Sequence, residues 1–438
     1  MANLLDQASI VLTPTAYDDG KVLCAKPSEP PYGDFDFSRN SAATRVNAQG
    51  LVENVQILSS NLVQNGDFSE EGVQEVSNGS FSQEGSELVT NGSFDTDSDW
   101  VKGTGWTISG GTANANVGNN VRLYQSGIGL QVGKTYLLKF DVLNYVSGSL
   151  KGFLGYTQSD GFIDATSNGS FEVFITPSNV SQDFVRFHSV GTFIGSIDNV
   201  SVKEVGQDWS LGTGWSIGED KAVFDDTTTN RISQTGLSIT SGKSYKINFT
   251  IADCPTTAHM TIYDGGGSDL IVPNENYVNG SYTRYYTATT NETGVSFWGN
   301  TAGDTFTITN ISVKEVGQDW TLGTGWSIGE DKAICDGTQT TFTGLIQDNV
   351  FTSGKTYKLT FNIVSNSQQF NFWVNGSQNI FATSFLSDGF KDYTFTASAS
   401  GKAYFEASSS FVGSVTNISV KEITDDTDLP RINYEGFS

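Results

Sequence analysis

The chain alternates between apolar and polar residues in many short stretches, and this period of two is typical of half-buried β-strands. Clear examples are residues 245–251 and 357–363, in which the aromatic and aliphatic side chains all fall on one face. The composition agrees, because 48 Gly, 29 Phe and 16 Tyr but only 2 Met favour strands and tight turns over helices. The pattern predicts an all-β protein.

One long segment occurs twice. Residues 201–222 and 312–333 are identical except for Ser210 in the first copy and Thr321 in the second, and a looser copy begins at Asp99. Each repeat also has a pair of tryptophans, a Gly-Lys-(Ser/Thr)-Tyr turn and a closing strand in the same order. Repeats of about 110 residues with many short strands have the size of a two-sheet sandwich. We interpret the paired tryptophans as structural anchors. The predicted organisation is an extended N-terminal docking segment, three tandem β-sandwich domains and a C-terminal tail, at 1–60, 61–205, 206–316, 317–423 and 424–438.

A second, shorter repeat precedes the first Trp pair. The motif Asn-Gly-x-Phe occurs at residues 65–68, 78–81 and 91–94, with a spacing of 13 residues. Asn-Gly is strong turn chemistry, since both residues tolerate positive φ, and we expect the Phe to fill a neighbouring core. One copy is enough to open the domain that follows, so we interpret the other two as duplicated, partly redundant strand-turn units.

The charge, the N-terminal sequence, the apolar runs and the cysteines restrict what the protein can bind and where it can fold. With 24 basic and 48 acidic side chains the formal net charge is −24, which repels nucleic acid and anionic lipid surfaces. The N-terminus has no signal-peptide pattern, and no apolar run is long enough to cross a bilayer. Three distant cysteines, Cys24, Cys254 and Cys335, form no disulfide framework, which fits folding in a reducing cytoplasm.

The residues for catalysis are sparse. His188 and His259, the two histidines, lie in different repeats, so a Ser-His-Asp or Cys-His site has little to draw on. The Gly-rich run at residues 265–267 lacks the Lys-Ser/Thr pair of a phosphate-binding loop. We therefore expect a protein that is not an enzyme.

The N-terminal run FDFSRNSAATRVNAQGLVENV, at residues 35–55, resembles the N-terminal region of structural proteins of tailed, especially marine, bacteriophages. In that group a segment like LPRINYEG follows soon afterwards, whereas here LPRINYEG stands at residues 429–436. We infer that the domains are inserted between two halves of one docking unit, near residues 44–52 and 429–434. The alternative is that both segments are strands of ordinary terminal domains.

This resemblance implies a protein of the virion surface that is made in the host cytoplasm. It further implies other virion proteins as partners and a homo-oligomer, for which we expect a trimer.

The repeats themselves resemble carbohydrate-binding modules of the galactose-binding-like jelly-roll type. The signals are the Asn-Gly-x-Phe opening, the Trp, the Gly-Lys-x-Tyr strand and a closing strand after an Asp-Asn pair. In that family, acidic residues at the first and last of these places often hold a structural calcium. The resemblance makes Asp95 and Asp198 candidate calcium ligands in the first repeat, and ordinary turn chemistry is the alternative. The other repeats have Thr309 and Thr416 before the Asn, which puts their metal in doubt.

A sugar site of this kind needs an aromatic ring to stack on the sugar and amides or carboxylates to bond its hydroxyls. In residues 370–375 the alternation places Asn371, Trp373 and Asn375 on the face opposite Phe370, Phe372 and Val374. The alternative is that Trp373 covers a sheet edge or packs against a symmetry mate. The corresponding glycan candidates in the second and first repeats are His259, Tyr263 and Tyr156.

Three functions remain open. The first is a non-enzymatic phage fibre, spike or head appendage whose domains bind host-surface glycans, where repetition would raise avidity. The second is a purely structural capsid-decorating protein that binds no sugar. The third is an accessory carbohydrate-binding protein of a glycan-degrading system.

Overall fold

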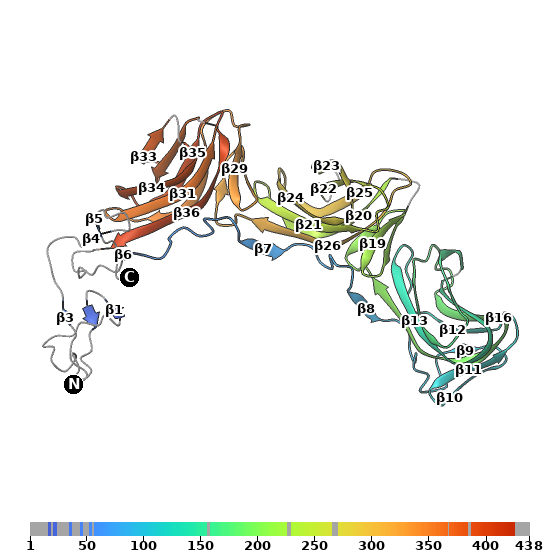
Figure 1. Ribbon diagram of the computed structural model, residues 1–438. Helices are drawn as coiled ribbons and strands as arrows, with labels where there is room; N and C mark the ends of the chain where they lie inside the picture. The colour runs from blue at the N-terminus through green and yellow to red at the C-terminus, as the bar shows by residue number, and fades with distance from the viewer. Residues whose placement is uncertain are drawn as a thin grey trace, which may run out of the picture. The chain divides into compact units, whose positions relative to one another are not determined.

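The structure is a computed structural model, shown in Figure 1. It describes residues 16–18, 21–23, 35–36, 44–46, 52–54, 57–155, 158–225, 229–264, 270–366, 368–383 and 387–424. The chain is all-β, as predicted, and its repeats are tandem β-sandwich domains. In the part that is described, the single helical element is the short 3₁₀ turn η1 (Gln158–Asp160), and no helix is long and apolar enough to cross a membrane.

The chain divides into two compact units. Residues 1–70 and 317–438 form one unit, and residues 71–316 form the other. The first unit holds the third repeat, which we call domain 3. The second unit holds the first and second repeats, domains 1 and 2.

Short strands precede the domains. Strands β1 (Ala16–Asp18), β2 (Lys21–Leu23) and β3 (Phe35–Asp36) form a three-stranded sheet. Strand β4 (Thr44–Val46) pairs antiparallel with β5 (Val52–Asn54). Residues 429–434, the second half of the predicted docking unit, lie outside the described residues.

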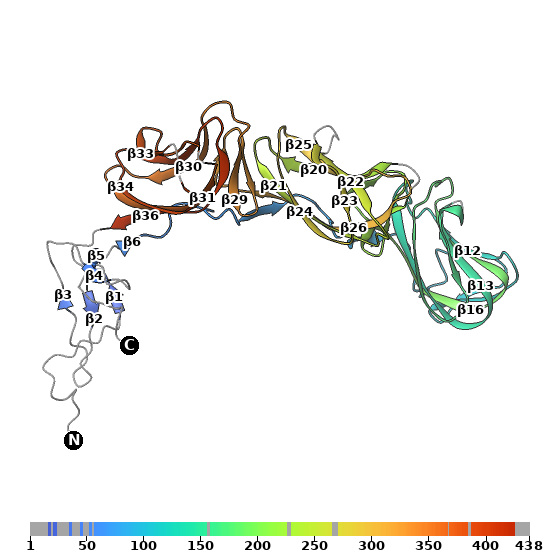
Figure 2. The same ribbon diagram turned by 45° about the horizontal axis from the view of Figure 1, so that its top comes forward.

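Domains 2 and 3 have the same design, a five-stranded sheet facing a six-stranded one (Figure 2). In domain 2 the five-stranded sheet has the order β17-β20-β25-β22-β23, and five strands of the six-stranded sheet have the order β18-β19-β26-β21-β24. In domain 3 the corresponding orders are β27-β30-β35-β32-β33 and β28-β29-β36-β31-β34. The sixth strand of each larger sheet pairs with β26 or β36 and is described below. The domain 2 strands are β17 (Trp209–Leu211), β18 (Trp215–Gly218), β19 (Lys221–Asp225), β20 (Asn230–Ile239), β21 (Ser244–Ala252), β22 (Ala258–Asp264), β23 (Leu270–Tyr277), β24 (Gly280–Thr287), β25 (Glu292–Gly299) and β26 (Thr305–Val316). The domain 3 strands are β27 (Thr321–Leu322), β28 (Trp326–Gly329), β29 (Lys332–Asp336), β30 (Thr343–Phe351), β31 (Thr356–Ser365), β32 (Phe370–Val374), β33 (Gln378–Thr383), β34 (Gly389–Thr396), β35 (Gly401–Ala407) and β36 (Val412–Thr424).

Domain 1 joins its two layers through long strands. Strands β13 (Thr135–Leu154) and β16 (Phe184–Val205) pair with each other along both layers, with register shifts between Leu143 and Ser149 where they pass from one layer to the other. The five-stranded layer contains β9, β12, β14 and one half of each long strand, and the other layer contains β10, β11, β15 and the remaining halves. The short strands are β9 (Val101–Lys102), β10 (Trp106–Ser109), β11 (Thr112–Val117), β12 (Arg122–Ser126), β14 (Ile163–Ala165) and β15 (Gly169–Ile175).

The last strand of each six-stranded layer comes from the segment with the 13-residue repeat. Strands β6 (Ile57–Leu58), β7 (Glu71–Gln74) and β8 (Glu84–Glu87) pair with the closing strands β36, β26 and β16. We call the three units strap A (57–70), strap B (71–83) and strap C (84–96). Strap A therefore completes domain 3, strap B domain 2 and strap C domain 1, in the reverse of the order of the domains along the chain.

All three straps dock in the same way. The phenylalanines Phe68, Phe81 and Phe94 are each 1% exposed and pack against the first Trp of their domain, with ring centroids 5.4, 5.2 and 5.2 Å apart. Each of these Trp side chains also donates its Nε1 proton to the carbonyl of the strap Asn, over 3.0 to 3.1 Å. The first Trp of each pair thus acts as a structural anchor, and the segment that it holds is the strap of its domain.

A buried glutamine fixes each strap from the other side. In domain 2 the Gln234 side chain accepts a hydrogen bond from the Ser77 amide (2.7 Å) and donates one to the Ser77 carbonyl (2.8 Å). Gln125 makes the same pair of bonds to Thr90, and Gln347 makes it to Gln64. Because a buried amide satisfies a buried peptide group in both directions, the contact is specific for one register.

The interpretation of two straps as redundant is wrong, and so is the assignment of residues 61–83 to domain 1. Each strap supplies a side chain to the core and a strand to the sheet of a different domain. Straps B and C also carry a carboxylate between two lysines: Glu71 pairs with Lys246 and Lys314, and Glu84 with Lys203 and Lys139. Hydrogen bonds from these lysines hold the pKa of both carboxyls below the usual value.

Candidate functional site

The outer face of the five-stranded layer carries the candidate binding residues in domains 2 and 3. In domain 3, β32 buries Phe370, Phe372 and Val374 in the core. The alternate residues Asn371 and Trp373 therefore point to the outer face, where β35 pairs with β32. Residues at the same register in the other domains can be compared directly, because the strand order is the same.

A carboxylate organises the outer face of domain 3. Glu406 accepts hydrogen bonds from Trp373 Nε1 (2.9 Å), Asn371 Nδ2 (2.7 Å) and the Tyr404 hydroxyl (3.2 Å). Burial, and then Glu406, raise the pKa of Tyr404, so this hydroxyl stays protonated and donates at neutral pH. With its acceptor sites used in this way, Glu406 holds the two aromatic rings in place.

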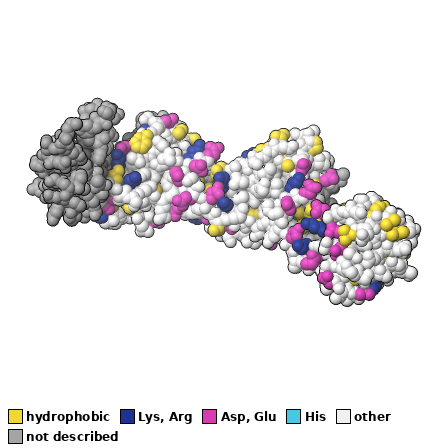
Figure 3. Space-filling view, turned by 60° about the horizontal axis from the view of Figure 1, so that its bottom comes forward, with side chains coloured by type: hydrophobic (Ala, Val, Ile, Leu, Met, Phe, Trp, Pro, Cys, Tyr) yellow, Lys and Arg dark blue, Asp and Glu magenta, His cyan; other side chains and the backbone are white. Residues whose placement is uncertain are grey.

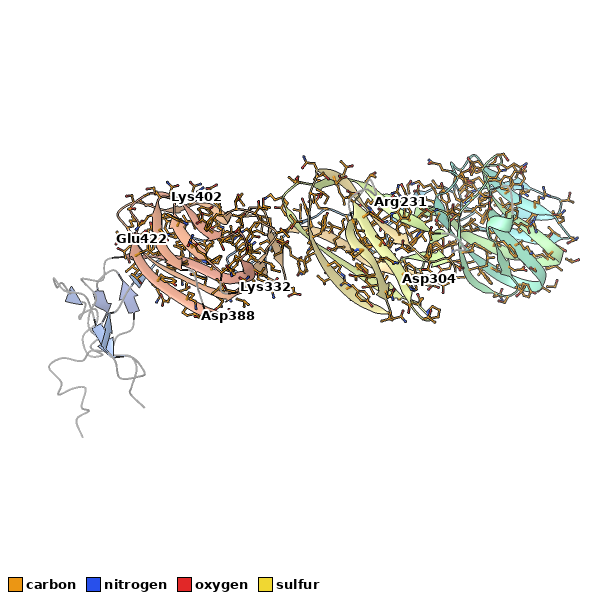
Figure 4. All side chains as sticks on the ribbon, turned by 90° about the horizontal axis from the view of Figure 1, so that it is seen from above. Arg231, Asp304, Lys332, Asp388, Lys402 and Glu422 are labelled. Carbon is orange, nitrogen blue, oxygen red and sulfur yellow. The ribbon has the colours of Figure 1, made fainter. Side chains whose placement is uncertain are left out.

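The rings of Trp373 and Tyr404 are half-buried. Tyr404 lies across the backbone of Gly344, where any Cβ would overlap its ring. The Lys402 ammonium, labelled in Figure 4, stands 5.4 Å from the Tyr404 ring centroid. Asn375 is exposed at the end of β32. The face can therefore offer flat ring surfaces to the C–H side of a sugar and a cation at their edge.

Domain 2 presents a different set at the same register. Trp298 on β25 lies between Arg231 on β20 and Thr261 on β22. The Arg231 guanidinium (Figure 4) is 5.1 Å from the Trp298 ring centroid, and the Tyr263 ring is edge-on to it at 5.9 Å. His259 is held away from this stack, because its Nδ1 and backbone amide both bond to Asp304, at 2.8 and 2.9 Å. The site of domain 2 is thus centred on Trp298 and includes Tyr263 but not His259.

Domain 1 replaces the aromatic centre with cations. Arg186 of β16 occupies the position of Tyr404, and its guanidinium covers the rings of Phe184 (3.9 Å) and Phe153 (5.2 Å). His188 follows on the same face, between Arg122 of β12 and Lys151 of β13. Tyr156, the candidate from sequence, lies outside the described residues.

His188 couples the stability of domain 1 to pH. Burial, and then the charges of Lys151, Arg122 and Arg186, hold the pKa of His188 below its usual value, and Asp164 opposes them weakly. The unfolded chain then binds this proton more readily than the folded one, so the stability of domain 1 falls as the pH drops below about 6.5. We expect H188Q to lose less stability than the wild type between pH 7.5 and 5.5, as measured by urea titration with hydrogen exchange of domain 1 peptides. Equal losses would contradict this assignment.

The candidate calcium ligands do not form a carboxylate-rich site. Asp95 is exposed and accepts a hydrogen bond from the Ser93 hydroxyl (2.7 Å), while Asp198 accepts one from the Asn199 amide (2.7 Å). Among the described residues, no group of three or more His, Cys, Asp or Glu side chains could hold a metal ion. Calcium binding at Asp95 and Asp198 stays a prediction.

Several residues of these faces were not found from the sequence. Trp298, Tyr404 and Glu406 lie on strands β25 and β35, which pair with the strands that carry the candidates. Arg231 lies on β20, which pairs with the far side of β25. The signal that could have found them is alternation in the strand before the closing strand, where Trp298 and Tyr404 stand between buried neighbours.

Comparisons with known proteins give the following. No family model and no curated protein matches the chain. Similar solved structures include the CBM22-1–CBM22-2 tandem domain of Paenibacillus barcinonensis Xyn10C (13% identity, 50% of this chain and 94% of that chain, TM-score 0.22). They also include a fucolectin from striped bass (Morone saxatilis) serum (9% identity, 47% and 86%, TM-score 0.20) and an archaeal virus protein with a triple jelly-roll fold (14% identity, 75% and 90%, TM-score 0.19). Scores this low carry no conclusion about the function of this chain.

Proposed function

We propose that the chain is a non-enzymatic structural protein of a bacteriophage virion surface whose tandem sandwich domains bind host-surface glycans. The observation that carries the proposal is the aromatic outer face of two domains, Trp373 with Tyr404 in domain 3 and Trp298 with Tyr263 in domain 2. Half-exposed rings beside amides and charges suit sugar recognition, which needs stacking and polar contacts together.

The pairing of β6 with β36 supports the virion part of the proposal. Ile57 lies opposite Thr424 in this pair, and in the sequence the two segments that resemble phage docking sequences stand just before Ile57 and shortly after Thr424. One attachment unit built from both segments is compatible with this arrangement. A homotrimer, with other virion proteins as partners, is the assembly that we propose, and the mass of the purified chain by light scattering tests it.

The glycan part is tested with the double variant Trp298→Ala and Trp373→Ala. We expect adsorption of the protein to host cells to weaken about tenfold or more, since two stacking platforms are lost and avidity multiplies the effect. The matched control is Phe390→Ala, because Phe390 is 64% exposed on β34 of the other sheet. Unchanged adsorption of the double variant would favour a decorating protein that binds no sugar.

A further inference from the structure

The outer face of the five-stranded layer of domain 1 concentrates positive charge. Arg122 and Lys151 lie directly opposite His188 on the two strands that flank it, and Arg186 stands two residues before His188 on the same face. Side chains directly opposite each other on paired strands have Cβ atoms about 5 Å apart. Three cations and an imidazole therefore share one small area.

Within the described part of the chain, these three cations form no ion pairs. Residues 84–205 contain seven Lys and Arg side chains, of which the other four are ion-paired: Lys102, Lys134, Lys139 and Lys203. Most Lys and Arg side chains on the face drawn in Figure 3 likewise lie beside Asp or Glu. Arg122, Lys151 and Arg186 make no ion pair with any described residue.

The nearest contacts of the three cations are not with acids. Arg186 donates a hydrogen bond to the Gln182 side chain (3.1 Å), and the Lys151 ammonium lies 4.0 Å from the Phe162 ring centroid. Asp164, opposite Lys151 on β14, accepts a hydrogen bond from the Ser149 hydroxyl instead. The contacts that hold the cluster in position are thus with uncharged groups, and the single carboxylate of Asp164 beside Lys151 offsets only part of the charge of three cations.

Such a cluster is unfavourable unless something else neutralises it. Like charges this close repel each other, and the effect is visible in Arg186, whose pKa is lowered by burial and then by Arg122. The chain as a whole carries a formal charge of −24, so a local excess of cations does not serve solubility. A grouped, unpaired set of cations on a sheet face attracts and orients an anion.

We propose that Arg122, Lys151 and Arg186 form a binding face for an acidic glycan on domain 1. Arginine forks match the planar carboxylate of an acidic sugar, and Lys151 supplies a further point charge. The half-buried Tyr124, opposite Arg186 on β12, adds a ring to the same face. Taking the ligand to be a glycan rests on the proposed function. Nucleic acid is disfavoured because the net negative charge of the chain repels a long polyanion.

The test measures binding of the full chain to an oligogalacturonate by titration calorimetry, with a neutral dextran oligomer for comparison. We expect oligogalacturonate to bind, dextran not to bind at this face, and the double variant Arg122→Gln and Lys151→Gln to weaken oligogalacturonate binding about tenfold. Arg186 is left intact because it also covers Phe153 and Phe184. The pKa of His188, followed by NMR, should rise in the complex as the anion offsets the neighbouring cations.

The matched control removes two paired lysines elsewhere, Lys332→Gln and Lys355→Gln, and should leave oligogalacturonate binding unchanged. Absence of binding, or equal weakening by this control, would overturn the proposal. Binding of a single-stranded DNA of equal charge as tightly as oligogalacturonate, with the same loss in the variant, would also overturn it. Failure of the proposed glycan function at Trp298 and Trp373 would leave these titrations unaffected, so the two ideas can fail separately.

Discussion

Replacement of Gly79 by alanine is expected to destabilise domain 2 and leave domains 1 and 3 unchanged. The Gly79 carbonyl accepts the Ile311 amide over 2.9 Å, and a Cβ at Gly79 would overlap the Ile311 carbonyl oxygen. The strap must then shift away from the closing strand, at a cost of about 3 kcal/mol. Hydrogen exchange with mass spectrometry, read on peptides of each domain, measures this loss.

The same experiment separates the straps. Gly92→Ala should act on domain 1 and Gly66→Ala on domain 3, because these glycines meet Val200 and Ile418 in the same way. The control is Gly118→Ala in domain 1, where no atom lies within 4 Å of the added Cβ. If Gly79→Ala instead loosened domain 1, the assignment of strap B to domain 2 would be incorrect.

A larger effect is expected when strap B is replaced whole by a Gly-Ser linker of equal length. Domain 2 then loses the buried Val76 and Phe81 and the two hydrogen bonds of Gln234. Deletion of one buried Phe side chain alone costs about 3–5 kcal/mol, so the total rivals the whole stability of a typical domain, about 5–15 kcal/mol. We expect domain 2 to be unfolded by hydrogen exchange while domains 1 and 3 stay protected.

Addition of a peptide with the sequence of residues 71–83 should restore protection in domain 2. A peptide in which Phe81 is replaced by Ala is the matched control and should bind far more weakly. Full protection of domain 2 in the linker variant before any peptide is added would mean that strap B is not part of the core of domain 2.

The sandwich design could be predicted from the sequence because it depends on local patterns. Alternation in residues such as 357–363 sets which face is buried, and the closing strand follows a fixed landmark in each repeat. The partners of the straps could not be predicted in this way. Phe81 fits the Trp209 pocket by the same chemistry with which Phe94 fits beside Trp100, so the pairing depends on contacts between distant segments.

The candidate site was only partly predictable for a related reason. Trp373 and Asn371 stand on one strand, where alternation shows their common face. Their organising partner Glu406 lies on the neighbouring strand, and its three hydrogen bonds arise from the sheet register. The cations of domain 1 were missed because Arg122, Lys151 and Arg186 are far apart in the sequence and meet only through β12, β13 and β16.

Because the order of the straps is reversed, the pairs of strap and domain are nested along the sequence: the last strap pairs with the first domain, and the first strap pairs with the last domain. Strap C stands next to domain 1 in the sequence, whereas strap A is the first strap and its partner, domain 3, is the last domain. A new strap and a new domain, inserted together between strap C and domain 1, would form a complete inner pair and leave every existing pair intact. One contiguous in-frame insertion at this single point could therefore lengthen the array, whereas removal of a domain elsewhere would leave its strap without a partner.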